Sequence, residues 1–165
     1  MMQFDLDERV AKAKRLFKEE GYNCCQAVVL AYNDLFDIDD IMAASLSSGF
    51  GGGMGRMREV CGSVSGMIIL AGLMAPADNP SDKNGRTRNY ALVQDIAGEF
   101  REMNGSIVCR ELLGLTPMGS SSPASQESPE PSDRTEEYYK KRPCEELVGI
   151  SARIIGEKML KMNDR

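Results

Sequence analysis

The residues of this chain that could carry redox or metal chemistry are its five cysteines, Cys24, Cys25, Cys61, Cys109 and Cys144. The chain contains no histidine, which excludes the Ser-His-Asp triad, the Cys-His nucleophile pair and every histidine metal ligand. No two cysteines have the C-x-x-C spacing, so the sequence carries neither a zinc-finger nor a thioredoxin-like motif. The chemistry that the sequence offers is therefore thiol chemistry.

Four of the cysteines are predicted to lie in the first turn of a helix. Each follows a helix-start signal: Cys24 follows Asn23, Cys61 follows the glycines at 51–53, Cys109 follows Ser106 and Cys144 follows Pro143. The unpaired N–H groups and the positive dipole of a first turn favour an anion and lower a thiol pKa. These four are therefore the predicted catalytic residues, although free cysteine also packs well in a core. Cys25 falls on another helix face, where packing is the preferred interpretation.

The stretch from residue 48 to 66, "SGFGGGMGRMREVCGSVSG", concentrates glycine around Cys61. It matches neither G-x-G-x-x-G nor the P-loop. Glycines ahead of a helix allow an anion or a second helix to approach closely, and Gly62 and Gly66 are one turn apart. Arg56 and Arg58 could stabilise a thiolate, unless they are solvated loop charges. The predicted cofactor- or ligand-binding residues are Gly51, Gly52, Gly53, Arg56, Gly62 and Gly66.

Helical spacing of apolar residues dominates the chain, and no β-alternation of useful length occurs. Helices are predicted over residues 7–20, 24–36, 41–50, 59–75, 87–103, 107–114 and 143–162. We therefore expect an all-α bundle of about six to seven helices, forming a single domain over residues 1–165. Residues 116–134 are rich in serine and proline and are expected to form a loop inside that domain.

Composition excludes two classes of partner. The 165 residues are 42% hydrophobic and carry a net charge of −5, with no basic stripe for nucleic acid and no polybasic tract or long apolar run for a membrane. The first residues lack the apolar core of a secretory signal.

A cytoplasmic protein is expected. Residues 24–36 are apolar on two faces, and one face could be buried in a homodimer.

Four segments together resemble a known family: "GYNCCQAV", "SGFGGGMGRMREVCGSVSG", "GSIVCRELLG" and "RPCEELV". From residue 10 to 160 the chain resembles the C-GCAxxG-C-C family of redox-active proteins. The resemblance implies that Cys24, Cys61, Cys109 and Cys144 are the four family cysteines. It also implies that Cys61, Gly62 and Gly66 form the CGAxxG element, with Ser63 in place of the usual alanine. The family label implies a thiol role and names no reaction.

Three functions remain open from the sequence. In the first, the four cysteines cycle between dithiol and disulfide, as in a thiol-disulfide oxidoreductase acting on a redox partner or small molecule. Cys61 is the expected nucleophile, because its surroundings are expected to be the most open, and Cys24 is the expected resolving residue. In the second, Cys24, Cys61, Cys109 and Cys144 bind zinc or an iron–sulfur cluster. In the third, the cysteines are packing residues of a non-enzymatic helical domain that binds a partner. No cofactor is required by the first or the third.

Overall fold

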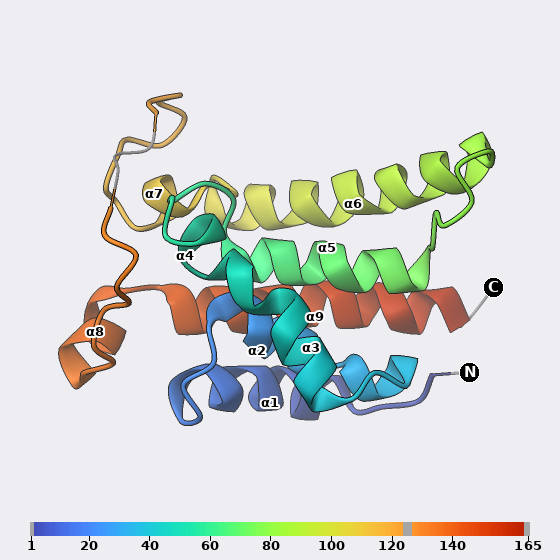
Figure 1. Cartoon of the computed structure of the whole chain (residues 1–165), viewed down its shortest axis with the longest axis horizontal. Coiled ribbons are helices and arrows are strands. Elements are labelled where there is room, and N and C mark those ends of the chain that lie inside the picture. Colours follow the sequence, from blue (N-terminus) through green and yellow to red (C-terminus); the bar gives the residue numbers. More distant parts are fainter. Residues whose placement is uncertain (1, 124–126, 164–165) are drawn as a thin grey trace.

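The computed structural model describes residues 2–123 and 127–163. Within these residues the regular structure is helical, apart from one isolated β-bridge. The prediction of a single all-α domain is thus confirmed. Four longer helices run across Figure 1 one above another. From bottom to top they are α1 (Leu6–Lys18), α9 (Cys144–Asn163), α5 (Gly62–Met74) and α6 (Lys83–Asn104).

The shorter helices position the functional region. They are α2 (Cys24–Leu30), the 3-10 helix η1 (Asn33–Phe36), α3 (Asp40–Ser47), the 3-10 helix η2 (Ser48–Phe50), α4 (Gly51–Met54), α7 (Cys109–Leu112) and α8 (Glu136–Lys141). In Figure 1, α4, α7 and α8 gather at the left end of the bundle, where α5 and α9 also begin. This end of the molecule therefore collects helix N-termini from distant parts of the sequence.

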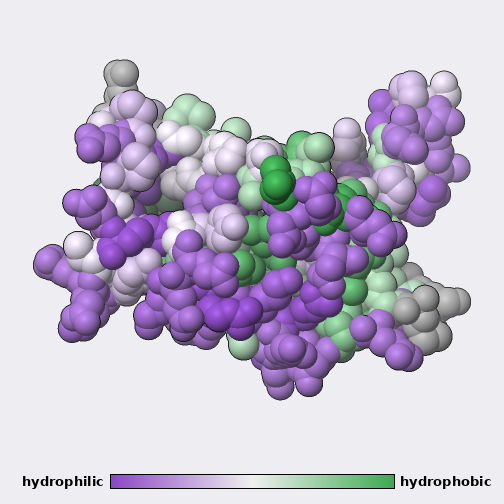
Figure 2. Space-filling view, turned by 60° about the horizontal axis from the view of Figure 1, so that its bottom comes forward, coloured by the Kyte–Doolittle hydropathy of each residue, from purple (hydrophilic) through white to green (hydrophobic). Residues whose placement is uncertain are grey.

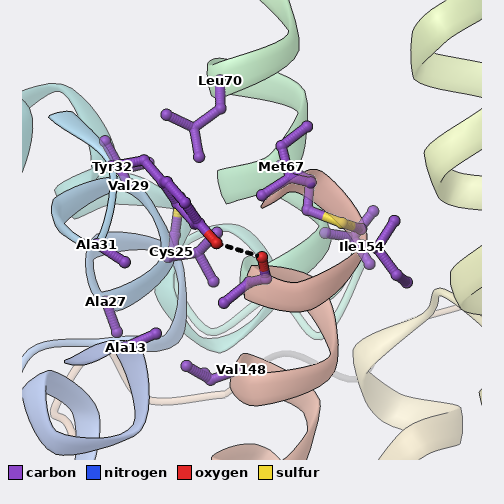
Figure 3. Close-up of a cluster of buried hydrophobic side chains, with 14 of the residues drawn as sticks. Ala13, Cys25, Ala27, Val29, Ala31, Tyr32, Met67, Leu70, Val148 and Ile154 are labelled. Atoms are coloured by element: carbon purple, nitrogen blue, oxygen red, sulfur yellow. Dashed lines mark hydrogen bonds between the residues drawn. The ribbon is translucent and has the colours of Figure 1, made fainter. Parts of the chain in front are cut away.

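The core lies between α1, α2, α5 and α9. Figure 3 shows side chains of these helices directed toward one another, including Cys25, Met67 and Val148. Cys25 is fully buried here, in agreement with its interpretation as a packing residue. The hydroxyl of Tyr32 donates a hydrogen bond of 2.7 Å to the carbonyl oxygen of Ala152 on α9, which satisfies the one polar group of an otherwise buried ring.

Both apolar faces of α2 are buried inside the chain. Cys25 and every residue from 27 to 30 are buried, because α2 packs against α1, α3, α5 and α9. The expectation that one face of this helix could serve a homodimer is therefore wrong. Large exposed apolar side chains occur on α3 instead, where Ile41, Met42 and Leu46 reach solvent.

Several helix boundaries differ from the sequence prediction. The helix predicted from residue 87 begins at Lys83, because the side chain of Asp82 accepts a hydrogen bond from the N–H of Gly85 and caps it. The helix predicted over 24–36 ends at Leu30 and continues as η1. Helix α8 was not predicted, although Thr135 caps it and acidic and basic residues occupy its first and last turns.

The face shown in Figure 2 is mostly hydrophilic, with hydrophobic atoms visible in smaller patches between the charged side chains. No helix in the described part of the chain has both the length and the apolar content needed to cross a membrane.

Candidate functional site: a cavity lined by four cysteines

An isolated antiparallel bridge holds two of the cysteines side by side. Val60 pairs with Val108, the N–H of Cys61 donates to the carbonyl of Ile107 at 2.8 Å, and the N–H of Cys109 donates to the carbonyl of Glu59 at 2.6 Å. Residues 61 and 109 therefore lie on the same side of the bridge. Helices α5 and α7 begin just after this bridge and not at the earlier residues predicted, because Cys61 and Val108 have non-helical backbone angles and act as the N-caps of α5 and α7.

Close packing of α2 against α5 brings in the third cysteine. A Cβ atom added to Gly62 would collide with the Sγ atom of Cys24, and one added to Gly66 would lie 2.8 Å from Cβ of Val28. The predicted close approach of a second helix beside Cys61 is thus confirmed. Asn23 fixes the start of α2, because its side chain accepts from the N–H of Gln26 while the Gln26 side chain accepts from the N–H of Asn23.

Cys144 completes the group as the first residue of α9. All four predicted cysteines line one cavity of about 60 Å³, which is enough for a few water molecules. Apolar side chains, including Phe17 and Leu147, form part of its wall. The cavity also receives three guanidinium groups, from Arg58, Arg134 and Arg142.

The four cysteines differ in their exposure to solvent. Cys61 is 6% exposed and Cys109 is 8% exposed, whereas Cys24 and Cys144 are half-buried. The expectation that Cys61 has the most open surroundings is therefore wrong: this residue belongs to the buried hydrophobic core cluster. Cys24 and Cys144 are therefore the more exposed of the four residues. All five cysteines are free thiols.

The glycine run shapes the wall of the cavity. Gly53 has a φ of +70°, and an added Cβ would lie 2.6 Å from Cβ of Cys109. Left-handed backbone continues at three residues with side chains, Met54, Arg56 and Arg58, whose φ values are 67°, 65° and 59°. Such a conformation costs roughly 1–2 kcal/mol for each residue that has a Cβ. The turn is stabilised by the N–H of Arg58, which donates to the carbonyl of Gly52 at 3.2 Å.

This turn directs the buried Arg58 side chain at a thiol. Nη1 of Arg58 donates to Sγ of Cys109 at 3.9 Å, and Nε and Nη2 donate to the carboxylate of Glu127 at 3.0 and 2.9 Å. Arg56 contacts Glu127 and Ser132 and does not line the cavity. The sequence suggested that Arg56 and Arg58 could stabilise a thiolate. Of these two, only Arg58 is placed to do so.

The other predicted ligand-binding residues do not all line the same pocket. Gly52 and Gly62 line the cysteine cavity, whereas Gly51, Gly52 and Arg56 line a neighbouring hollow. Gly66 faces α2, and a Cβ at Gly51 would lie 2.6 Å from Nδ2 of Asn23. These glycines admit other parts of the same chain, and their role toward a ligand stays a prediction.

Comparison with protein families matches residues 22–158 to the family described as "Putative redox-active protein (C_GCAxxG_C_C)". The chain belongs to this family. The matched segment contains the whole cysteine cavity except Phe17. No curated protein and no solved structure matches the chain.

Three of the four cavity thiols have raised pKa values, contrary to the lowered values expected from helix N-termini. Burial raises the pKa of Cys61, of Cys109 and of Cys144, the last to about 12. A negative charge on Cys24 raises all three further. Desolvation exceeds the favourable effect of the helix ends, because these sulfur atoms lie in a mostly apolar cavity.

Neighbouring groups oppose this effect of burial. The Arg58 guanidinium lowers the pKa of Cys109, and Arg142 and Arg134 lower that of Cys144. Ser63 forms a hydrogen bond of 3.2 Å with Sγ of Cys61 and lowers its pKa. These interactions reduce the free-energy cost of forming each of these three thiolates below the cost that burial alone would set.

A stability measurement can test the direction of these shifts at Cys25, whose pKa is raised by burial from an ordinary value of 9.0. Above that pH the unfolded chain loses the Cys25 proton while the native state keeps it, so the free energy of unfolding falls. Between about pH 9 and about pH 10 we expect the native protein to lose about 1 kcal/mol more than the Cys25→Ala variant. Urea unfolding in the presence of a reductant measures both. Equal losses would show that the Cys25 pKa is not raised.

The four-cysteine metal site receives no geometric support. Among residues 2–123 and 127–163, no three Cys, Asp or Glu side chains are placed to hold one metal ion. The four thiols share a cavity without converging on one point in the manner of a tetrahedral site.

Sequence reasoning missed Arg134, Arg142 and Tyr138, which line the cavity. Arg142 could have been found, because it stands two residues before Cys144 at a predicted helix start. Arg134 had no such signal. It reaches the site because its guanidinium packs on the ring of Phe17, 4.5 Å from the centroid, and donates to the carbonyls of Phe17 and Tyr22.

Proposed function

We propose that this protein carries out thiol–disulfide exchange, with Cys24 as the nucleophile and Cys61 as the resolving thiol. The observation that carries the proposal is the gathering of four free thiols from four separate helix starts around one cavity. Membership of a family described as redox-active agrees with it.

The choice of Cys24 follows from access and position. Cys24 is half-buried while Cys61 is covered. The Sγ atom of Cys24 packs against Gly62, which directly follows Cys61. Burial has the largest effect on the pKa of Cys61, and the charge of Cys24 has the second largest. Cys24 and Cys61 are therefore the best-supported pair, and Cys24, the more exposed residue of the two, meets the substrate first.

The exchange consists of two displacements. Cys24 loses its proton to solvent, and its thiolate forms a bond to one sulfur of a substrate disulfide. The substrate S–S bond breaks, and its electron pair leaves with the second substrate sulfur, which takes up a proton. Cys61 then loses its proton and its thiolate attacks Sγ of Cys24. The first substrate sulfur leaves with the electron pair, takes up a proton and becomes the second thiol. The protein dithiol is oxidised to a disulfide, and the substrate disulfide is reduced to two thiols.

The proposal predicts a reversible mass change. Fully reduced protein treated with the neutral reagent 2-hydroxyethyl disulfide should lose two hydrogens, release two molecules of 2-mercaptoethanol for each disulfide formed, and recover its mass with dithiothreitol. Intact-mass spectrometry and peptide mapping identify the paired residues. The Cys25→Ala variant serves as the control and should behave as the native protein. A native protein that gains no disulfide under these conditions would contradict the proposal.

A further inference from the structure

A second hollow of about 350 Å³ adjoins the cysteine cavity. The two share part of their walls, including Asn23, Arg58 and Tyr138. We call this hollow the arginine vestibule, because four arginines line it, namely Arg56, Arg58, Arg134 and Arg142. In the parts of the chain that the structure describes, no aspartate or glutamate lines it. Its volume lies within the range of small-molecule sites.

A carboxylate of the same chain already contacts two of these arginines. Glu127 accepts hydrogen bonds from Nε and Nη2 of Arg58, in the two-point geometry that guanidinium groups form with carboxylates. It also accepts from Nη2 of Arg56 at 3.3 Å. The two guanidinium groups lower the pKa of Glu127. Arg58 is itself buried, so this is a built carboxylate site and not a chance surface pair.

The remaining positive charge of the arginine vestibule is not neutralised within the described residues. Arg134 donates to backbone carbonyls and to the Tyr139 hydroxyl, and Arg142 stacks 4.6 Å from the centroid of the Tyr138 ring. Neither has a carboxylate partner there. Glu127 thus offsets one of four positive charges, in a protein whose net charge is −5. A concentration of positive charge against the overall charge attracts anions to this place.

We propose that the arginine vestibule binds the carboxylate group of a small anionic ligand. The ligand pairs with Arg142 and Arg134 and competes with Glu127 for Arg58. Because the vestibule shares part of its wall with the cysteine cavity, its occupant would be a carboxylate-bearing disulfide if the protein catalyses the exchange proposed above, and that identification of the substrate rests on the proposed function. A carboxylate is favoured over other anions because a carboxylate is the group that Arg58 holds in the structure.

The charge preference can be measured with two alkylating reagents of similar size, the anion iodoacetate and the neutral iodoacetamide. The readout is the ratio of their rates at the cavity cysteines, located by peptide mass spectrometry. At low ionic strength Arg142→Gln should lower the iodoacetate-to-iodoacetamide ratio about threefold, whereas Glu127→Gln should raise it. Arg86→Gln, which removes an exposed charge near the far end of α6, should leave the ratio unchanged.

A binding measurement that needs no thiol reaction provides the second test. Succinate should raise the melting temperature of the native protein relative to the uncharged succinamide at matched ionic strength, and Arg142→Gln should remove the difference. Equal rate ratios in the native protein and Arg142→Gln, together with no stabilisation by succinate, would overturn the vestibule proposal. Failure of the exchange reaction shows separately, as the absence of a disulfide after treatment with the neutral 2-hydroxyethyl disulfide.

Discussion

Replacing Cys24 with serine is expected to lower the rate of intramolecular disulfide formation by about 100-fold or more, because a hydroxyl cannot replace a thiolate as nucleophile. The measurement is the loss of two hydrogens by intact mass during treatment with 2-hydroxyethyl disulfide. Cys25→Ala is the matched control: it removes the adjacent thiol, which is buried in the core, and should leave the rate unchanged.

The complementary variant distinguishes the two proposed roles. Cys61→Ser should leave the first displacement intact and remove the second, so the protein should accumulate a mixed disulfide with the reagent at Cys24. Peptide mapping locates the adduct. If Cys24→Ser still forms an intramolecular disulfide at the native rate, the nucleophile is another thiol, and the half-buried Cys144 becomes the first one to examine.

A large loss of stability is expected where α2 packs on α5. Gly66→Ala should destabilise the native state by about 2 kcal/mol, because the added methyl group would lie 2.8 Å from Cβ of Val28 and 3.0 Å from the backbone oxygen of Cys25. Backbone atoms of a buried helix cannot move aside cheaply. The free energy of unfolding in urea measures the change.

The same helix provides the control. Gly72 also lies in α5, but an added Cβ there would meet nothing within 4 Å. Gly72→Ala should therefore stabilise the protein by up to about 1 kcal/mol through the higher helix propensity of alanine. Equal stabilities for the two alanine variants would mean that α2 and α5 are not in close contact at Gly66.

Local signals in the sequence were sufficient for most of the helices. Asn23 caps α2 as its position indicated, and the one-turn spacing of Gly62 and Gly66 predicted the close approach of a second helix. These features depend on neighbours within four residues or on a pattern along one face. The start of α6 was missed by four residues, because the capping role of Asp82 was not recognised in a polar segment.

The arrangement of the site depended on contacts that no local pattern contains. The bridge between Val60 and Val108 joins residues 48 positions apart, and it is too short to produce a strand pattern. Cys61 directly follows this bridge and lies in the hydrophobic core cluster, so the thiol that the sequence predicted to be the most open is one of the most buried. The pKa prediction failed for the same reason, since a helix start favours a thiolate only when solvent or a charge offsets burial.

Arg58 has a consequence for which amino acids its position can accept. Its φ of 59° lies in a region where glycine or asparagine would fit with less strain, while its guanidinium spans the gap between Cys109 and Glu127. The backbone and the side chain thus favour different residues at one position. Natural selection has to keep the strained residue there as long as the guanidinium is useful. At Met54 a glycine could relieve similar strain without losing such a contact. Substitution should therefore be tolerated more readily at Met54 than at Arg58.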